Sequence, residues 1–243
     1  MSIGLTVCDT IISKQKNWRL DVRKKQIANI TGIVLAGGKS SRLGREKALE
    51  KIGGMRLIER VVDTLVPISQ EVLVVTSKEQ VEKISSLDLK ARTIVDVYPG
   101  KAAFGGIYTG LVSASTRYGL VVACDMPFLN SDLLSYLVEI AIGFDIVIPK
   151  VGGNIEPLHA VYSGDCLATI KQLLDNNILQ MLQLLDLVKT RYVGDDEVDK
   201  FDSEHLSFLN INTQDDVIKV NKLIERMEQN ARIKKDGQDN AHC

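Results

Sequence analysis

The sequence lacks the features that mark several specialised classes of protein. Its four cysteines (Cys8, Cys124, Cys166 and Cys243) are far apart and form no CxxC pair, which excludes a disulfide scaffold and the usual zinc ribbons. The longest stretch without Asp, Glu, Lys or Arg runs from Ala102 to Thr116. It contains three glycines and is too short to cross a bilayer, so no spanning helix is expected.

An excess of charge of either sign is also missing. The net charge is −1 and the isoelectric point is about 6.3, so no global basic field indicates binding to nucleic acid or to an anionic membrane. The first twelve residues lack the basic start of a secretory signal. We therefore expect a cytoplasmic protein that binds neither nucleic acid nor membrane.

The chain has 243 residues, of which 45% are hydrophobic, enough for a large core without disulfides or structural metals. Short, wholly apolar segments alternate with helical patterns, which is typical of a parallel sheet covered on both faces. The expected strands are Ile30 to Ala36, Val72 to Val75, Arg92 to Val97, Leu120 to Ala123 and Asp145 to Ile148. Helices are expected between them, including 133–141 after the candidate N-caps Asn130 and Ser131.

The pattern changes after Pro149. A turn signal at Gly152-Gly153-Asn154 separates two extended runs, 146–150 and 158–162, and predicts an antiparallel hairpin. Further on we expect a strand over 208–211 and a helix that opens at Thr213 and continues to about Met227. Together these elements predict a single Rossmann-like, three-layer α/β domain with a mostly parallel sheet and one antiparallel hairpin.

The domain is expected to span residues 29–228. Residues 1–28 form a leader that carries six basic residues between Lys14 and Lys25. We interpret this leader as a mobile arm, with a docking segment for a partner protein as the alternative. Residues 229–243 are interpreted as a polar, disordered C-terminal tail.

A glycine-rich segment follows the first strand. It reads Leu35-Ala36-Gly37-Gly38 and continues to Lys47 with four basic side chains, including Arg42, and one acid. Glycines at the carboxyl end of a strand let N–H groups cradle phosphate oxygens. The spacing fits neither the dinucleotide fingerprint nor the P-loop. A phosphate site and a tight turn with solvated basic residues both remain compatible with this segment.

Polar side chains follow other predicted strands. Asp125 comes directly after the fourth strand, where a carboxylate can hold Mg²⁺ together with substrate phosphates or can cap a turn. Asp96 ends the third strand, and Asn210 and Asn212 lie two apart in an extended run, on one side of the expected strand. His159 lies in a strand, where a lone histidine is more often packed than catalytic.

The sequence 35–54, LAGGKSSRLGREKALEKIGG, resembles the signature of the MobA-like nucleotidyltransferases. Five other stretches agree in the same order: DVYPG (96–100), GGIYTGL (105–111), ACDMPFL (123–129), EPLHAVYS (156–163) and NINTQDD (210–216). The resemblance spans about residues 30 to 225 and is strongest to the members that act on the molybdenum cofactor.

The resemblance implies a reaction and a set of site residues. GMP would pass from GTP to the phosphate of molybdopterin carrying molybdenum, with release of pyrophosphate and with Mg²⁺ as the cofactor. Lys47, Arg42 and Asp125 would be catalytic, and Asp125 would hold the metal. The nucleotide would contact a set of eight residues: Leu35, Ala36, Gly37, Gly38, Lys47, Thr76, Asp96 and Asp125. His159, Asn210 and Asn212 would lie near the acceptor.

The sequence departs from the family pattern in two segments that could line the acceptor pocket. Residues 101–104 replace the usual glycine-proline-leucine run, and residues 176–178 lack a frequent arginine. A cytidylyltransferase of the same cofactor pathway, or another small-molecule nucleotidyltransferase, is the alternative enzyme. A non-catalytic nucleotide-binding partner of a molybdoenzyme is the alternative of a different class. A molybdoenzyme or a cofactor chaperone would be a fitting protein partner.

Overall fold

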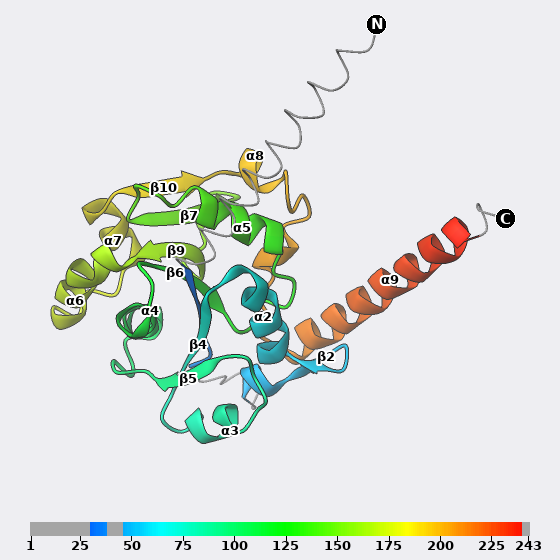
Figure 1. The fold of residues 1–243 in the computed structure, drawn as a ribbon, viewed down its shortest axis with the longest axis horizontal. Coiled ribbons are helices and arrows are strands. Elements are labelled where there is room, and N and C mark those ends of the chain that lie inside the picture. Colours follow the sequence, from blue (N-terminus) through cyan, green and yellow to red (C-terminus); the bar gives the residue numbers. More distant parts are fainter. Residues whose placement is uncertain (1–29, 38–45, 240–243) are drawn as a thin grey trace, which may run out of the picture.

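A computed structural model describes residues 30–37 and 46–239 of the chain. Its centre is a twisted sheet with the strand order β10-β7-β9-β6-β1-β4-β5, and β8 pairs with β7 (Figure 1). The strands are β1 (Ile30–Leu35), β4 (Glu71–Thr76), β5 (Arg92–Val95), β6 (Tyr118–Ala123), β7 (Ile146–Val151), β8 (Asn154–Ile155), β9 (His159–Ser163) and β10 (Thr190–Val193). A separate antiparallel ribbon consists of β2 (Lys51–Ile52) and β3 (Met55–Arg56).

Most neighbouring strands of the sheet run parallel, as the apolar strand pattern predicts. The β1 strand pairs in parallel with β4 and β6, β4 with β5, and β10 with β7. Among the described strands of this main sheet, only β9 and the short β8 are antiparallel to their neighbours. The carboxyl ends of β5, β4, β1 and β6 therefore lie side by side along one edge.

Helices cover both faces of this sheet and make the expected three layers (Figure 1). Buried side chains of α4, α6 and α7 fill the core on one face, and those of α2 and α5 fill the core on the other. Neighbouring residues of β1 alternate between the two cores, Ile33 in one and Val34 in the other. The helices are α2 (Leu57–Leu65), α3 (Val81–Ser85), α4 (Ala102–Ser113), α5 (Ser131–Glu139), α6 (Leu167–Asp175), α7 (Met181–Leu187), α8 (Asp195–Val198) and α9 (Gln214–Asp239). Short 3₁₀ helices cover Lys47–Leu49, Val66–Ile68, Gly164–Cys166 and Leu206–Phe208.

Local capping explains where the helices begin. Asn130 is the N-cap of α5, because its side chain accepts hydrogen bonds from the N–H groups of Asp132 and Leu133. The predicted capping pair at the last helix is present as well. The Asp216 carboxylate accepts from the Thr213 N–H, and the Thr213 hydroxyl accepts from the Asp216 N–H.

The helix α4 lies unusually close to the sheet, and glycine makes this possible. A Cβ atom placed on Gly110 would lie 2.4 Å from Cγ2 of Ile33 in β1. The start of α4 is thereby held at the carboxyl edge of the strands, beside the end of β5. The sequence predicts this helix only from Ile107 onward, whereas it begins five residues earlier, at Ala102.

The predicted antiparallel hairpin after Pro149 is confirmed, with one short strand more than the sequence predicts. The turn at Gly152-Gly153, with φ of +55° and +83°, joins β7 to the two-residue β8. The longer returning strand, β9, does pair with β7 in antiparallel fashion, but it also pairs with β6. It is therefore inserted into the middle of the sheet and is not added at an edge.

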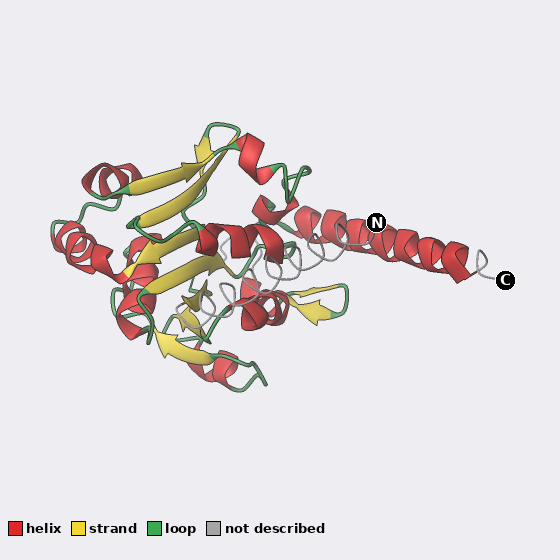
Figure 2. Ribbon diagram, turned by 45° about the horizontal axis from the view of Figure 1, so that its top comes forward, coloured by secondary structure: helices red, strands yellow, loops and turns green. Residues whose placement is uncertain are grey.

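The end of the chain differs from the prediction in two ways. No strand covers residues 208–211, which contain the end of a 3₁₀ helix and an extended segment. Furthermore, α9 does not end near Met227 but continues to Asp239, within the stretch predicted to be a disordered tail, and projects from the domain (Figure 2). The predicted leader, residues 1–28, lies outside the described residues. Among the described helices, α9 included, none combines the length and the apolar composition needed to span a membrane.

Candidate active site

A cleft opens at the carboxyl edge of β1, β4, β5 and β6, where the sequence places the nucleotide. Its volume is about 270 Å³. It is lined by Leu35, Ala36, Gly37, Lys47, Ala48, Val75, Gln80, Asp96, Ala102, Ala103, Gly106, Ala123, Cys124, Asp125 and Leu158. Of the predicted nucleotide-binding residues, this cleft brings together Leu35, Ala36, Gly37, Lys47, Asp96 and Asp125.

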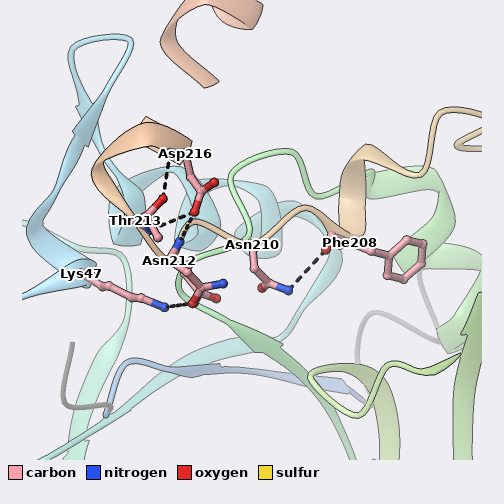
Figure 3. A network of polar contacts seen from close by, with 7 residues as sticks. Lys47, Phe208, Asn210, Asn212, Thr213 and Asp216 are labelled. Carbon is pink, nitrogen blue, oxygen red and sulfur yellow. Dashed lines mark hydrogen bonds and ion pairs between the residues drawn. The ribbon is translucent and has the colours of Figure 1, made fainter. Parts of the chain in front are cut away.

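Lys47 connects three segments of the chain at one end of the cleft. Its ammonium donates to Oδ2 of Asp125 at 2.7 Å and to Oδ1 of Asn212 at 2.6 Å. Figure 3 shows the lysine side chain reaching toward Asn212 from the 3₁₀ helix that begins at residue 47. The Lys47 and Asp125 side chains are 21% and 16% exposed, so this ion pair lies at the border between the protein and the open cleft.

Backbone hydrogen bonds fix Asp125 and Asn212 beside each other. The Ile211 N–H donates to the Asp125 carbonyl at 3.0 Å, and the Ile211 side chain is fully buried. The Asn212 N–H donates to the Asp216 carboxylate at 3.0 Å (Figure 3). The cap of α9 therefore also places the Asn212 amide beside Lys47.

The donor set at this end fits a magnesium ion bound mainly through a substrate. Among the described residues, no group of three or more His, Cys, Asp or Glu side chains could enclose a metal. Instead, one carboxylate oxygen and one amide oxygen, from Asp125 and Asn212, converge on the same cationic nitrogen. Mg²⁺ takes such hard oxygen ligands, typically one or two from the protein, and completes its shell with phosphates and water.

Asp96 stands at the opposite end of the cleft, where the chain leaves β5. Its Oδ1 accepts hydrogen bonds from the Tyr98 N–H at 2.9 Å and from the Thr109 hydroxyl at 2.8 Å. Thr109 is 1% exposed and in turn accepts from the Val97 N–H. These bonds fix the carboxylate, and its Oδ2 has no hydrogen bond to any described residue.

The glycine turn contributes less backbone than the sequence predicts. The Ala36 N–H donates to the Val75 carbonyl at 2.8 Å, as a continuation of the sheet, so it is not available to a nucleotide. The Gly37 N–H has no hydrogen-bond partner among the described residues. Gly38 and Arg42 lie outside the described residues.

Two further predicted residues, Thr76 and Asn210, do not line the cleft. Thr76 is fully buried at the end of β4, and its hydroxyl donates to Oε1 of Gln80. Asn210 is exposed and donates to the Phe208 carbonyl, pointing away from Lys47 (Figure 3). The predicted pairing of Asn210 and Asn212 on one side of a strand is wrong, because residues 208–211 form no strand.

His159, which the resemblance places near the acceptor, does not line the cleft either. Its ring is fully buried and packs on Phe208, with 4.7 Å between the ring centroids. Neither ring nitrogen has a hydrogen-bond partner within the described part of the chain. Burial lowers the pKa of His159 to about 4, so the imidazole is neutral at pH 7. His159 therefore lies in the environment of a core residue. A lone histidine in a strand is more often packed in this way than catalytic.

Covalent catalysis by the nearby cysteine has no support. Cys124 is 7% exposed beside Asp125. Burial, and then the charge of Asp125, raises the pKa of the Cys124 thiol to about 12. A thiol is not nucleophilic in this protonated form.

The sequence analysis named residues 101–104 as a possible pocket wall, and Ala102 and Ala103 do line the cleft. It did not predict Gly106, which brings α4 to the same wall, or Leu158, which forms another part. Gln80 enters from the loop after β4. The motif GGIYTGL could have indicated this wall, since it contains both Gly106 and Thr109, but Gln80 carries no recognisable signal.

The two segments that depart from the family pattern lie next to each other. The Lys101 ammonium donates to Oδ1 of Asn177 at 2.7 Å. Asn177 and Ala102 both have positive φ, +57° and +48°. This link joins the start of α4, which lines the cleft, to the end of α6.

A glycine turn, a lysine and two carboxylates at the carboxyl edge of a mostly parallel sheet define the class of protein: a nucleotidyltransferase. The model of the MobA-like NTP transferase domain matches residues 32–189, and the chain belongs to this family.

Curated relatives and solved structures agree. The chain is 34% identical over 195 residues to "Probable molybdenum cofactor guanylyltransferase" of Pelotomaculum thermopropionicum, covering 80% of this chain and 93% of that protein. It is 30% identical over 198 residues to "Molybdenum cofactor guanylyltransferase" of Desulfosudis oleivorans, covering 81% and 96%. The crystal structure of molybdopterin-guanine dinucleotide biosynthesis protein A from Archaeoglobus fulgidus has a TM-score of 0.72 and 31% identity, covering 81% and 99%.

Proposed function

We propose that this nucleotidyltransferase transfers GMP from GTP to the phosphate of molybdopterin in the molybdenum cofactor and releases pyrophosphate. The names of the curated relatives support the guanylyl donor and the acceptor. The observation that carries the proposal is the meeting of Lys47 and Asp125, which line one cleft, with Asn212, which accepts from the same lysine.

The main obstacle in this reaction is electrostatic. The acceptor phosphate is an anion at neutral pH and needs no general base, but it must approach a second anion, the triphosphate. Positioning and charge neutralisation therefore account for catalysis. The Lys47 ammonium can exchange the Asp125 oxygen for phosphate oxygens, because both are partly exposed to the cleft. The Gly37 N–H supplies a neutral donor beside it.

Magnesium would be held by the Asp125 carboxylate, with the Asn212 amide oxygen as the second protein ligand. When bound, the ion neutralises charge on the phosphate oxygens. Asp125 and Asn212 keep this position through the Ile211 and Asp216 hydrogen bonds, so the chain presents both oxygens before any substrate arrives.

The experiment is incubation of the protein with Mg²⁺, molybdenum-loaded molybdopterin and each of the four nucleoside triphosphates in turn. Mass spectrometry identifies the product, and a coupled assay follows pyrophosphate. The expected result is a guanine dinucleotide from GTP alone. A cytosine dinucleotide would instead assign the cytidylyltransferase reaction. Tight GTP binding without pyrophosphate release would contradict a catalytic role altogether.

A further inference from the structure

The order of the strands fixes the direction of a nucleotide in the cleft. Asp125 follows β6, Gly37 follows β1, Gln80 follows β4 and Asp96 follows β5, in that order along the sheet edge. Three strand spacings of about 4.8 Å place the two ends roughly 14 Å apart, which is the scale of a nucleoside triphosphate. Among the described lining residues, Lys47 is the only cation. The phosphates therefore belong at the β6 end and the base at the β4–β5 end.

The β4–β5 end presents one hydrogen-bond donor and one acceptor that no described residue uses. The Thr76 hydroxyl donates to Oε1 of Gln80 at 3.3 Å, which turns the Gln80 amide so that Nε2 is left with its two N–H donors. Oδ2 of Asp96 is the acceptor. Both residues line the cleft, and the wall beside them consists of the small residues Ala102, Ala103 and Gly106.

Guanine satisfies this pair of groups with one hydrogen bond more than adenine or cytosine can make. Guanine carries the acceptor O6 next to the N1–H and N2–H₂ donors. A carboxylate accepts from both donors, and an amide N–H donates to O6. Adenine has a donor where guanine has O6 and lacks the 2-amino group. Cytosine, like adenine, has a single amine next to an acceptor ring nitrogen, so either base offers the carboxylate one donor group where guanine offers two.

On these observations we infer that Gln80 is a specificity-determining residue, whose Nε2 donates to O6 of guanine while Asp96 accepts from the opposite side of the same base edge. This inference rests on the proposed function, since it assumes that the nucleotide is GTP. Thr76 then acts as a positioning residue, because its hydroxyl sets the orientation of the Gln80 amide.

The test is calorimetric titration of GTP, inosine triphosphate, 6-thio-GTP and CTP into the wild-type protein and three variants, with Mg²⁺ present. Inosine lacks the 2-amino group, and 6-thioguanine replaces O6 by sulfur, a weaker acceptor. Gln80→Leu removes the amide. Gln80→Glu keeps an oxygen for Thr76 but puts an acceptor against O6. Gln183→Leu, at an exposed glutamine of α7, is the matched control.

We expect the wild-type protein and Q183L to bind GTP about tenfold more tightly than 6-thio-GTP, the value of one hydrogen bond. Q80L should bind GTP about tenfold more weakly and lose this difference, yet keep the preference for GTP over inosine triphosphate. Q80E should bind GTP more weakly still. If Q80L keeps the wild-type affinity and the wild-type ratio of GTP to 6-thio-GTP, the inference is wrong. A wild-type protein that binds CTP more tightly than GTP would instead refute the proposed function.

Discussion

The Lys47 ammonium lies 2.7 Å from Oδ2 of Asp125, although 78 positions separate the two residues in the chain. The lysine follows the glycine-rich segment after β1, and the aspartate follows β6, the neighbouring strand. Opposite charges at this edge are therefore held together by the topology of the sheet and not by local sequence. Substrate phosphates and a metal would compete for the same two groups.

Removal of the carboxylate should stop the reaction and spare the fold. Asp125→Ala is expected to lower the rate of pyrophosphate release by about 100- to 1000-fold, the usual effect of losing one preorganised charge at a reacting centre. The Asp125–Lys47 pair is partly exposed, so its loss should cost at most about 1 kcal/mol of stability. Thermal unfolding and a coupled pyrophosphate assay measure the two effects.

The matched control is Asp165→Ala, which breaks an exposed ion pair with Arg117 away from the cleft. It should leave the rate of pyrophosphate release unchanged. An Asp125→Ala variant with near-wild-type turnover would remove this residue from the mechanism.

Thr109 should affect nucleotide binding through Asp96. Thr109→Val keeps the shape of the side chain but removes the hydroxyl that donates to Asp96 Oδ1 and accepts from the Val97 N–H. We expect the KM for GTP to rise about fivefold to tenfold with little change in kcat, because ground-state binding is lost. The unpaired Val97 N–H should cost about 1–2 kcal/mol of stability.

Thr64→Val is the control for this substitution, since the Thr64 hydroxyl donates to a carbonyl within α2 and does not reach the cleft. Equal values of KM for GTP in both variants would contradict the positioning role of Thr109.

The buried His159 predicts a pH dependence of stability. Because burial lowers its pKa from 6.5 to about 4, the folded protein keeps the imidazole neutral in a range where the unfolded chain protonates it. The free energy of unfolding should therefore fall as the pH falls from 6.5 toward 4, by at most about 3 kcal/mol from this group. Urea unfolding at a series of pH values measures this slope.

His159→Leu should remove the contribution of this histidine and raise stability near pH 5 relative to the wild-type protein. Glu156, whose pKa is raised by burial, works in the opposite direction, but it is present in both proteins and cancels in the difference. A wild-type curve parallel to that of His159→Leu between pH 6.5 and 4.5 would show that the folded protein already protonates the ring.

The close contact between α4 and β1 predicts a coupled pair of substitutions. Gly110→Ala would place a methyl group 2.4 Å from Ile33 Cγ2, and the resulting overpacking should cost about 1–3 kcal/mol. Ile33→Ala alone leaves a cavity and should cost about 2–5 kcal/mol. In the double variant the new methyl group occupies part of that cavity. The stability lost in the double variant should therefore be clearly smaller than the sum of the losses in the two single variants. Chemical unfolding of the four proteins gives the coupling free energy, and strict additivity would disprove the contact.

The sequence predicts the parallel half of the sheet well, and for a physical reason. Strands buried on both faces are apolar throughout, so β1, β4 and β6 are recognisable one by one, and their carboxyl ends must share an edge. That argument also places Asp96 and Asp125 in one cleft.

Features that depend on distant partners are beyond this kind of prediction. Leu209 and Ile211 alternate with Asn210 and Asn212 at the two-residue period of a strand. The Ile211 N–H nevertheless donates to the Asp125 carbonyl and not to a neighbouring strand. Nothing in the local pattern of His159 indicates that its ring nitrogens find no partner among residues 30–37 and 46–239. Gln80 is one polar residue among several in its loop, and only the cleft distinguishes it.

The insertion of β9 between β6 and β7 has a consequence for how the protein forms. Among the described strands, the two halves of the sheet do not pair directly with each other and are joined only through β9. During synthesis, the segment up to β7 would therefore leave β6 with an open edge until residues 159–163 emerge from the ribosome. Contacts this distant in sequence slow folding and prolong the exposure of unpaired backbone, so a nascent chain that pauses before residue 159 would be the species most in need of a chaperone.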